Sequence, residues 1–416
     1  MKKLVSCILA LFLLAMLVIP AAAAEDCEAA IGGLENDIWF SKYGNVYTNC
    51  SAADFMGSLG YTWGDLVRVQ ILDQELLLPV VPDYSYVDSG ATAIIVRRDE
   101  SGQPDGYVSM AINMGNFAEV YGLATKITDD EGNWHWEAQE GVTFPLTVRF
   151  SMAEPGSYRA QVLLHDLTRT NAREDYPHLS DPEFANFREL LPGKLYRTSS
   201  PINPELGRNA YADSAVERAG VTVIMNLADS PEEANSYPGF TDSYYSRQQV
   251  IFLNLGVDFA AADFQAGLAK GLRFFAEHPG TYAVHCTEGK DRAGFVSALL
   301  NCLAGKSYEE VVSDYMVTYH NYYGVEPGTE KYDAIANSNI IKTLKTAYGV
   351  EDLENADLNR EAEEYILQIG LTKQELSQLK SNLGIREPVS NALIVVLTGA
   401  VLVCGVLLIR KRTHTK

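Results

Sequence analysis

The sequence predicts a multidomain protein: a mostly β N-terminal domain, an α/β domain whose sheet is flanked by helices, and a C-terminal transmembrane helix. Three observations lead to this fold class. Residues 25–164 contain short alternating or β-branched runs, which are typical of strands. Residues 185–385 alternate apolar strands with amphipathic helices, as in a sheet covered by helices. An apolar run near the end of the 416-residue chain approaches the length that spans a bilayer.

Both ends of the chain carry targeting patterns. Two lysines, an apolar run and a group of small residues make up residues 1–24, which is the arrangement of a signal peptide. Residues 390–409 are predicted to form the transmembrane helix, and the basic tail 410–416 is expected in the cytoplasm. Together they predict a single-pass protein of a Gram-positive-like bacterial cell membrane, with its body outside the cell.

The N-terminal domain is expected to be built from β-strands. A polar segment with glycine, residues 99–102, is typical of a hairpin turn within it. The predicted strands, which share alternating or β-branched apolar residues, are 67–71, 92–96, 106–112, 144–150 and 158–164.

The second domain is expected after a linker. Residues 165–184 are polar and contain two prolines, so they predict a connection between domains. The domain itself, residues 185–385, is predicted to contain an α/β sheet followed by a group of helices. Its expected strands are 221–227, 250–255 and 282–284, and its expected helices are 212–219, 264–277, 308–319, 331–348, 359–369 and 373–383.

The stretch 281–305 is the centre of the predicted chemistry. A short buried strand leads into a polar loop from Cys286 to Arg292, and a helix with an apolar face follows. Loop N–H groups and the positive end of the helix dipole would point at one spot and bind an anion. The same environment, with Lys290 nearby, favours the thiolate form of Cys286. Because Arg292 offers a planar fork that matches two phosphate oxygens, the loop predicts a phosphoryl-transfer site.

The run His-Cys-Thr-Glu-Gly-Lys-Asp-Arg-Ala-Gly, residues 285–294, resembles the signature of the cysteine-based tyrosine and dual-specificity phosphatases. Within them it is similar to a bacterial branch that includes secreted tyrosine phosphatases acting also on phosphoinositides. The resemblance implies that Cys286 forms a phosphocysteine while Arg292 holds the phosphate. The other loop residues that it assigns to phosphate binding are Thr287, Glu288, Gly289, Lys290, Asp291, Ala293 and Gly294.

The leaving oxygen needs a proton, and a carboxyl group is the usual donor. Asp258 is the first candidate, because it lies in the loop before the penultimate helix of the sheet, where this family's acid resides. Asp263 and Asp229 are the alternatives. The same residue would then activate water to hydrolyse the phosphocysteine.

Three further residues have expected roles. Arg197 follows a segment that resembles the first hairpin of the same branch, and it could neutralise a substrate or hold a loop. Lys290 would add positive charge at the rim of the loop, which suits substrates with more than one phosphate. The family usually has Ser or Thr after the arginine, so Ala293 predicts slower hydrolysis of the phosphocysteine.

The N-terminal domain carries a second resemblance. Residues 42–49, 64–67, 82–87 and 111–119 are similar, in order, to segments of the C-terminal β-domain of the S-adenosylmethionine hydroxide adenosyltransferases. This implies a module for binding or scaffolding, with a nucleoside pocket as the alternative. Cys27 and Cys50 lie in the same exported part and could form a disulfide.

These observations predict an extracellular, membrane-anchored phosphatase that hydrolyses phosphomonoesters, either phosphotyrosine in proteins or phosphoinositides and inositol phosphates. The expected partners are the phosphorylated substrate and the membrane. A net charge of −21 argues against nucleic acid. No cofactor or metal is required by the predicted chemistry. The alternatives are a surface binding protein with a weakly active phosphatase domain and a nucleoside-binding β-domain.

Overall fold

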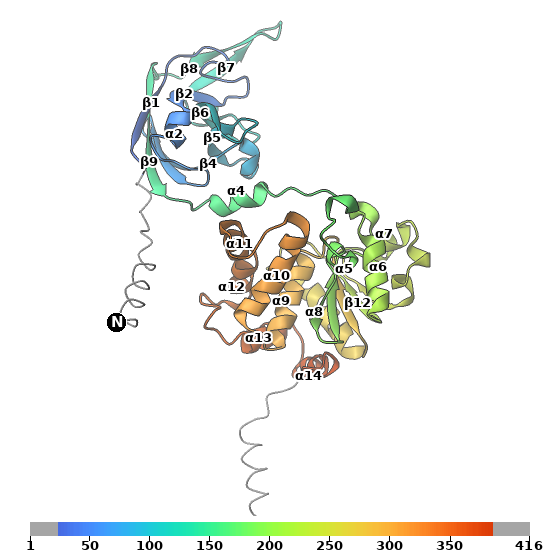
Figure 1. Ribbon diagram of the computed structural model, residues 1–416. Helices are drawn as coiled ribbons and strands as arrows, with labels where there is room; N and C mark the ends of the chain where they lie inside the picture. Colours follow the sequence, from blue (N-terminus) through green and yellow to red (C-terminus); the bar gives the residue numbers. More distant parts are fainter. Residues whose placement is uncertain (1–23, 386–416) are drawn as a thin grey trace, which may run out of the picture. The chain divides into compact units, whose positions relative to one another are not determined.

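The computed structural model describes residues 24–385, shown in colour in Figure 1. Contacts within the chain divide it into two units. The first runs to Thr168 and includes Asp333–Ser338, and the second contains Arg169–Tyr332 and the residues from Asn339 on. Each unit is described by itself below.

The first unit is mostly β, as predicted. Its main sheet has seven strands in the order β1-β9-β3-β4-β5-β6-β2, and β7 and β8 form a separate antiparallel hairpin (Figure 1). Alternate residues of β3 are buried, so one face of that strand covers the core. The strands are β1 (Cys27–Ile31), β2 (Val46–Ser51), β3 (Leu66–Ile71), β4 (Gln74–Val81), β5 (Thr92–Arg98), β6 (Pro104–Ile112), β7 (Ala124–Thr128), β8 (Trp134–Ala138) and β9 (Leu146–Glu154). The helices among and after them are α2 (Ala52–Met56), η1 (Tyr84–Tyr86), α3 (Phe117–Val120) and α4 (Arg159–His165).

The strand predicted at 158–164 is wrong, because this segment forms helix α4. Two adjacent residues, Val162 and Leu163, are its buried ones. A strand would have turned them to opposite faces, whereas neighbouring positions can share the buried side of a helix. Val162 packs with Val81 and Ile95 of the sheet. The prediction was right that this segment contains buried apolar residues, but it assigned them the spacing of a strand and not that of a helix.

The second unit is α/β, as predicted. Its five-stranded sheet has the order β10-β11-β14-β12-β13, in which β10 and β11 are antiparallel and the other neighbours are parallel. Strands β12 and β14 are buried on both faces, because helices cover the sheet on both sides (Figure 1). The strands are β10 (Arg188–Leu191), β11 (Leu195–Thr198), β12 (Val223–Asn226), β13 (Gln249–Phe252) and β14 (Tyr282–His285).

The helices predicted from residue 212 on are present with shifted ends, and Asp333–Ser338 among them belong to the first unit. The segment predicted as one helix at 331–348 is interrupted by a π-helical turn, η6. The helices are η2 (Arg173–Asp175), α5 (Asp181–Phe184), η3 (Pro204–Leu206), α6 (Asn209–Arg218), α7 (Pro231–Ser236), η4 (Phe240–Asp242), η5 (Tyr245–Arg247), α8 (Ala262–Glu277), α9 (Arg292–Leu303), α10 (Tyr308–Tyr323), α11 (Glu330–Ala336), η6 (Asn337–Ile341), α12 (Lys342–Tyr348), α13 (Leu358–Gln368) and α14 (Lys373–Asn382).

Most of the segment predicted as a linker packs against the second unit. Tyr176, Leu179 and Phe184 are buried and form a small apolar cluster with Tyr211 of α6. A flexible connection would leave such side chains in water, and their burial fixes this segment on the α/β unit.

The transmembrane helix included in the predicted fold class is corrected. Within residues 24–385, no helix combines the length and the apolar character needed to cross a membrane. The fold class is therefore one β unit and one α/β unit. The predicted signal peptide, apart from Ala24, lies outside the described residues, as do the segment 390–409 and the tail 410–416.

Two cysteines of the first unit, Cys27 and Cys50, lie close together. The sulfur atoms of Cys27 on β1 and Cys50 on β2 are 3.9 Å apart, and both are free thiols in this structure. The disulfide between them stays a prediction, and the pair is positioned where oxidation would need little movement.

Candidate active site

The loop between β14 and α9 leaves the carboxyl edge of the parallel strands. β14 lies between β11 and β12, so the loop emerges from the middle of the sheet. Cys286 follows the last residue of β14 and is only 2% exposed, and Arg292 is the first residue of α9. The two residues assigned to catalysis by their spacing are thus at the two ends of one short loop.

The loop is held from outside by its carbonyl groups. Tyr322 donates a hydrogen bond to the carbonyl oxygen of Glu288 at 2.8 Å. Arg197 donates to that of Gly289 at 2.7 Å, and Asn186 donates to the same oxygen at 3.2 Å. Because the carbonyl groups turn toward these donors, the N–H groups are free to face the other way. Over residues 24–385, no acceptor is found for the backbone N–H groups of 287–291. Such a set of free N–H groups at a helix N-terminus binds an anion.

A buried charge network supports the same loop. Asp314 of α10 pairs with Arg188 at 2.8 Å and with Arg197 at 3.0 Å. Burial alone would raise the pKa of Asp314, but the two guanidinium groups outweigh it and lower that pKa. Arg197 is completely buried and donates to the backbone of the loop. Of the two roles expected for it, neutralising a substrate or holding a loop, these contacts favour the second.

Glycine is required at one position in the loop and at one in the first turn of α9. Gly289 has φ +68°, and a Cβ there would lie 2.3 Å from the carbonyl oxygen of Thr198. At Gly294, a Cβ would lie 2.6 Å from the ring of Tyr315. Neither position has room for a larger side chain. Glycine therefore lets the loop pack closely against β11 and the start of α9 pack closely against α10.

Arg292 joins the loop to the segment that carries the candidate acid. Its Nη1 donates to the carbonyl oxygen of Leu255 at 2.9 Å, and its Nη2 lies 3.4 Å from Oγ1 of Thr287. Leu255 is three residues before Asp258, which is exposed and accepts a hydrogen bond from the N–H of Ala260 at 3.1 Å. An exposed carboxyl group suits a proton donor when its loop is hydrogen-bonded to the catalytic arginine, as this one is through Leu255. The role of Asp258 stays a prediction.

The two alternative acids are engaged elsewhere. Asp229 is buried and accepts hydrogen bonds from Asn226 at 3.0 Å and from Tyr237 at 2.8 Å. Asp263 lies in the first turn of α8, where its carboxylate accepts from the N–H of Phe264 at 2.8 Å. The burial and the two side-chain bonds of Asp229 favour a structural role for it, and Asp263, which is exposed like Asp258, stays the alternative acid.

His285 is held in a neutral state beneath the loop. It is fully buried, and its Nε2 lies 2.9 Å from the hydroxyl of Tyr245. Burial lowers the pKa of His285 to about 4, although Asp229 acts in the opposite direction. Its Nδ1 lies 3.4 Å from the carbonyl oxygen of Cys286, so the ring orients the loop without titrating near neutral pH.

The buried imidazole predicts a pH-dependent loss of stability. The pKa of His285 is about 4 in the folded chain, whereas an ordinary histidine has a pKa of 6.5, so the unfolded chain binds the proton more tightly between these two pH values. The free energy of unfolding should therefore fall by roughly 2–3 kcal/mol through this group as the pH drops from 7 to 4.5. Urea unfolding at pH 7 and at pH 4.5 measures this change in the free energy of unfolding. The variant His285→Gln should lose the part of the change that His285 causes.

The control for that experiment is His320→Gln, at a more exposed position on α10. It should keep the pH dependence of the unmutated protein. An equal pH dependence in the unmutated protein and in His285→Gln would contradict the assignment.

Four charged side chains lie around the loop. Glu288 pairs with Arg169 at 2.6 Å and with Lys290 at 2.9 Å, and Asp291 lies 3.7 Å from Lys290. Burial opposes ionisation of Glu288, but its ion pairs prevail and lower its pKa. Burial likewise opposes the charge of Lys290, and the neighbouring carboxylates prevail and raise the pKa of that ammonium group. Both side chains are therefore charged at neutral pH.

The remaining assigned loop residues sit as follows. Thr287 is partly buried beside Arg292, and Ala293 is fully buried in the first turn of α9. The structure thus brings all the predicted loop residues together. The residues that sequence reasoning missed are the supports Asn186, Asp314 and Tyr322, which lie far away in the chain and carry no spacing signal.

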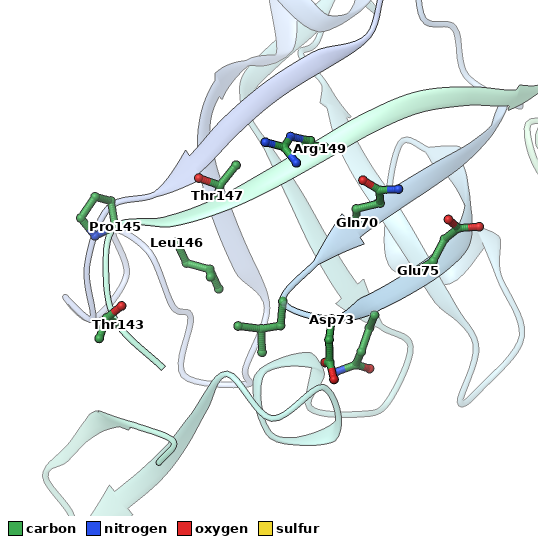
Figure 2. A pocket seen from close by; sticks show the side chains of 10 residues that line it. Gln70, Asp73, Glu75, Thr143, Pro145, Leu146, Thr147 and Arg149 are labelled. Atoms are coloured by element: carbon green, nitrogen blue, oxygen red, sulfur yellow. The ribbon is translucent and has the colours of Figure 1, made fainter. Parts of the chain in front are cut away.

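The first unit has cavities of its own. One of about 540 Å³ lies at the β3–β4 turn and the start of β9, with Gln70, Arg149 and Thr147 on its wall (Figure 2). Another of about 420 Å³ is lined by Tyr43, Asn45, Tyr84, Ile112, Met114 and Gly115. Neither wall contains a cysteine, serine or histidine, so neither resembles the loop of the second unit.

The second unit thus combines a mainly parallel sheet with a short loop that carries a cysteine and an arginine at its two ends. Residues 182–384 match the tyrosine phosphatase family, and residues 38–128 match the S-adenosylmethionine hydroxide adenosyltransferase C-terminal domain. Both resemblances seen in the sequence are confirmed.

One curated relative is a tyrosine-protein phosphatase of Nostoc commune. It is 31% identical over 134 residues, which are 27% of this chain and 42% of the relative. The chain therefore spans less than half the length of this relative.

Solved structures of phosphatases are also similar. TpbA of P. aeruginosa in complex with phosphotyrosine is 14% identical with a TM-score of 0.26, over 40% of this chain and 91% of that one. The core catalytic domain of the PP-IP phosphatase SIW14 of S. cerevisiae is 15% identical with a TM-score of 0.26, over 41% of this chain and 96% of that one. TM-scores this low add nothing to the assignment.

Proposed function

We propose that this chain hydrolyses phosphomonoesters as a phosphatase of the tyrosine or dual-specificity type, through a phosphocysteine intermediate. The observation that carries the proposal is the loop itself. Buried Cys286 and the guanidinium of Arg292 stand at its ends, and the N–H groups of 287–291 have no acceptor among the described residues. A dianionic phosphoryl group would complete this arrangement.

The chemistry follows from these positions. The Cys286 sulfur attacks phosphorus in line with the leaving oxygen, so an S–P bond forms as the P–O bond breaks. Arg292 and the loop N–H groups stabilise the charge on the equatorial oxygens. Asp258 gives its proton to the leaving oxygen, and the resulting carboxylate then takes a proton from the water that hydrolyses the phosphocysteine.

Phosphate release by the full chain tests the proposal. The substrates are a phosphotyrosine peptide, a soluble phosphoinositide and an inositol phosphate, with p-nitrophenyl phosphate as a general reporter. Turnover of at least one is expected, and turnover of none would favour a binding protein. A location outside the cell belongs to the proposal, supported by the pattern of residues 1–24 alone.

Asp258→Asn should slow the reaction according to the leaving group. For a phosphotyrosine peptide, kcat should fall by about 10²-fold or more, because the phenolate must leave without a proton. The loss should be smaller for p-nitrophenyl phosphate, whose leaving group is stable as an anion. Steady-state kinetics across pH would also show the loss of the basic limb of the profile.

Asp263→Asn is the matched control, since Asp263 is an exposed carboxylate close in the chain. It should leave both rates near those of the unmutated protein. A larger effect at Asp263 than at Asp258 would reassign the acid.

A further inference from the structure

Two cations beside the loop between β14 and α9, Arg169 and Lys290, are already paired with a carboxylate. Arg169 Nη1 lies 2.6 Å from one oxygen of Glu288, and Lys290 Nζ lies 2.9 Å from the other. The single carboxylate thus bridges both cations. The three side chains are only 18–24% exposed, so water and salt screen these pairs less than they would on an open surface.

Both cations also contact the hydroxyl group of one tyrosine. The Tyr323 hydroxyl accepts from Arg169 at 3.2 Å and from Lys290 at 3.4 Å. Asp291 lies 3.7 Å from the Lys290 ammonium group, and the Arg169 guanidinium lies 5.1 Å from the Tyr322 ring. Two cations and two carboxylates leave the cluster without net charge.

This pairing changes the expectation for Lys290. A second phosphate that bound Lys290 would displace Glu288 from it, and one that approached Arg169 would lie beside the same carboxylate. The displaced carboxylate would stay in the loop, close to the incoming negative charge, and such like-charge contacts are costly. The cluster therefore repels a second phosphate instead of recruiting it.

We propose that Glu288 is a specificity-determining residue, which selects isolated phosphomonoesters such as phosphotyrosine over substrates with a second phosphate beside the reacting one. The inference rests on the proposed function and names its substrate class. Specificity of this kind comes from an element that disfavours the wrong ligand as much as from contacts to the right one.

The test is a ratio of two kcat/KM values measured on the same protein. One substrate is a phosphotyrosine peptide with neutral flanking residues, and the other is a soluble phosphoinositide with two adjacent phosphates. A defect common to both substrates cancels in the ratio. We expect the unmutated chain to prefer the peptide, and Glu288→Gln to shift the ratio toward the bisphosphate by about tenfold or more.

Two further variants make the result specific. Glu277→Gln removes one exposed negative charge at the end of α8, before β14 begins, and should not move the ratio. Arg169→Gln leaves Glu288 with one cation fewer, so the ratio should shift further toward the peptide. A shift toward the bisphosphate in Arg169→Gln would overturn the inference.

The outcomes separate the two proposals. An unmutated chain that prefers the bisphosphate, or a ratio unchanged in Glu288→Gln, refutes the role of Glu288 while the phosphatase assignment stands. Absence of turnover on both of these substrates, on the inositol phosphate and on p-nitrophenyl phosphate refutes the phosphatase assignment itself. Thermal unfolding of each variant confirms that the compared proteins are folded.

Discussion

Cys286→Ser is expected to lower kcat by about 10⁴-fold or more, because a serine hydroxyl at this position is not ionised and is a far weaker nucleophile. Serine differs from cysteine by one atom, and the free N–H groups of the loop stay in place. The variant should therefore still bind phosphate. Rapid-quench experiments followed by mass spectrometry should show a phosphoryl group on the unmutated protein and none on the variant.

Cys302→Ala is the control for this result. Cys302 lies on α9, fully buried, and burial raises the pKa of its thiol to about 11. It is therefore a core residue, and its replacement should leave kcat unchanged at temperatures where the protein is folded. Substantial turnover in Cys286→Ser, or a trapped phosphoryl group on another residue, would contradict the assigned nucleophile.

Arg292→Lys is expected to reduce kcat/KM by about 10³-fold, although it keeps the positive charge. A lysine cannot donate to Leu255 and Thr287 from a rigid fork, and it cannot hold two phosphate oxygens in parallel. Both the arginine's contacts to the acid-bearing loop and its fit to the transition state are lost. Steady-state kinetics and the Kd of inorganic phosphate measure the two effects separately.

Arg218→Lys on α6 gives the matched control. Arg218 is exposed and, among residues 24–385, bonds only Ser214 one turn earlier, so this substitution should leave kcat/KM unchanged. If Arg292→Lys retained most of the activity, a point charge would suffice at that position and the bidentate contact would be refuted.

The position of the loop between a strand and a helix was predictable from the sequence because its parts are local. Cys286 and Arg292 are separated by five residues, and an apolar strand and an apolar-faced helix enclose them. Local patterns of this kind survive folding, since the backbone between the two residues is too short to separate them.

The supports of the loop were not predictable in the same way. Asn186 bonds the Gly289 carbonyl group from 103 residues away, and Arg197 meets Asp314 across 117 residues. Only the pairing of strands and the packing of α10 bring such residues together, and no spacing encodes it. The wrong prediction at helix α4 has another cause, because a short run with adjacent apolar residues is compatible with a strand or with a helix.

The packing of residues 169–184 determines where the catalytic unit can be excised. A fragment cut at the predicted domain start, residue 185, would lose the aromatic cluster around Tyr176 and the cation that anchors Glu288. Its phosphate loop would then carry a carboxylate with one partner missing. Limited proteolysis of the intact chain should accordingly spare this segment, and a fragment beginning before Arg169 is the one that keeps the native loop.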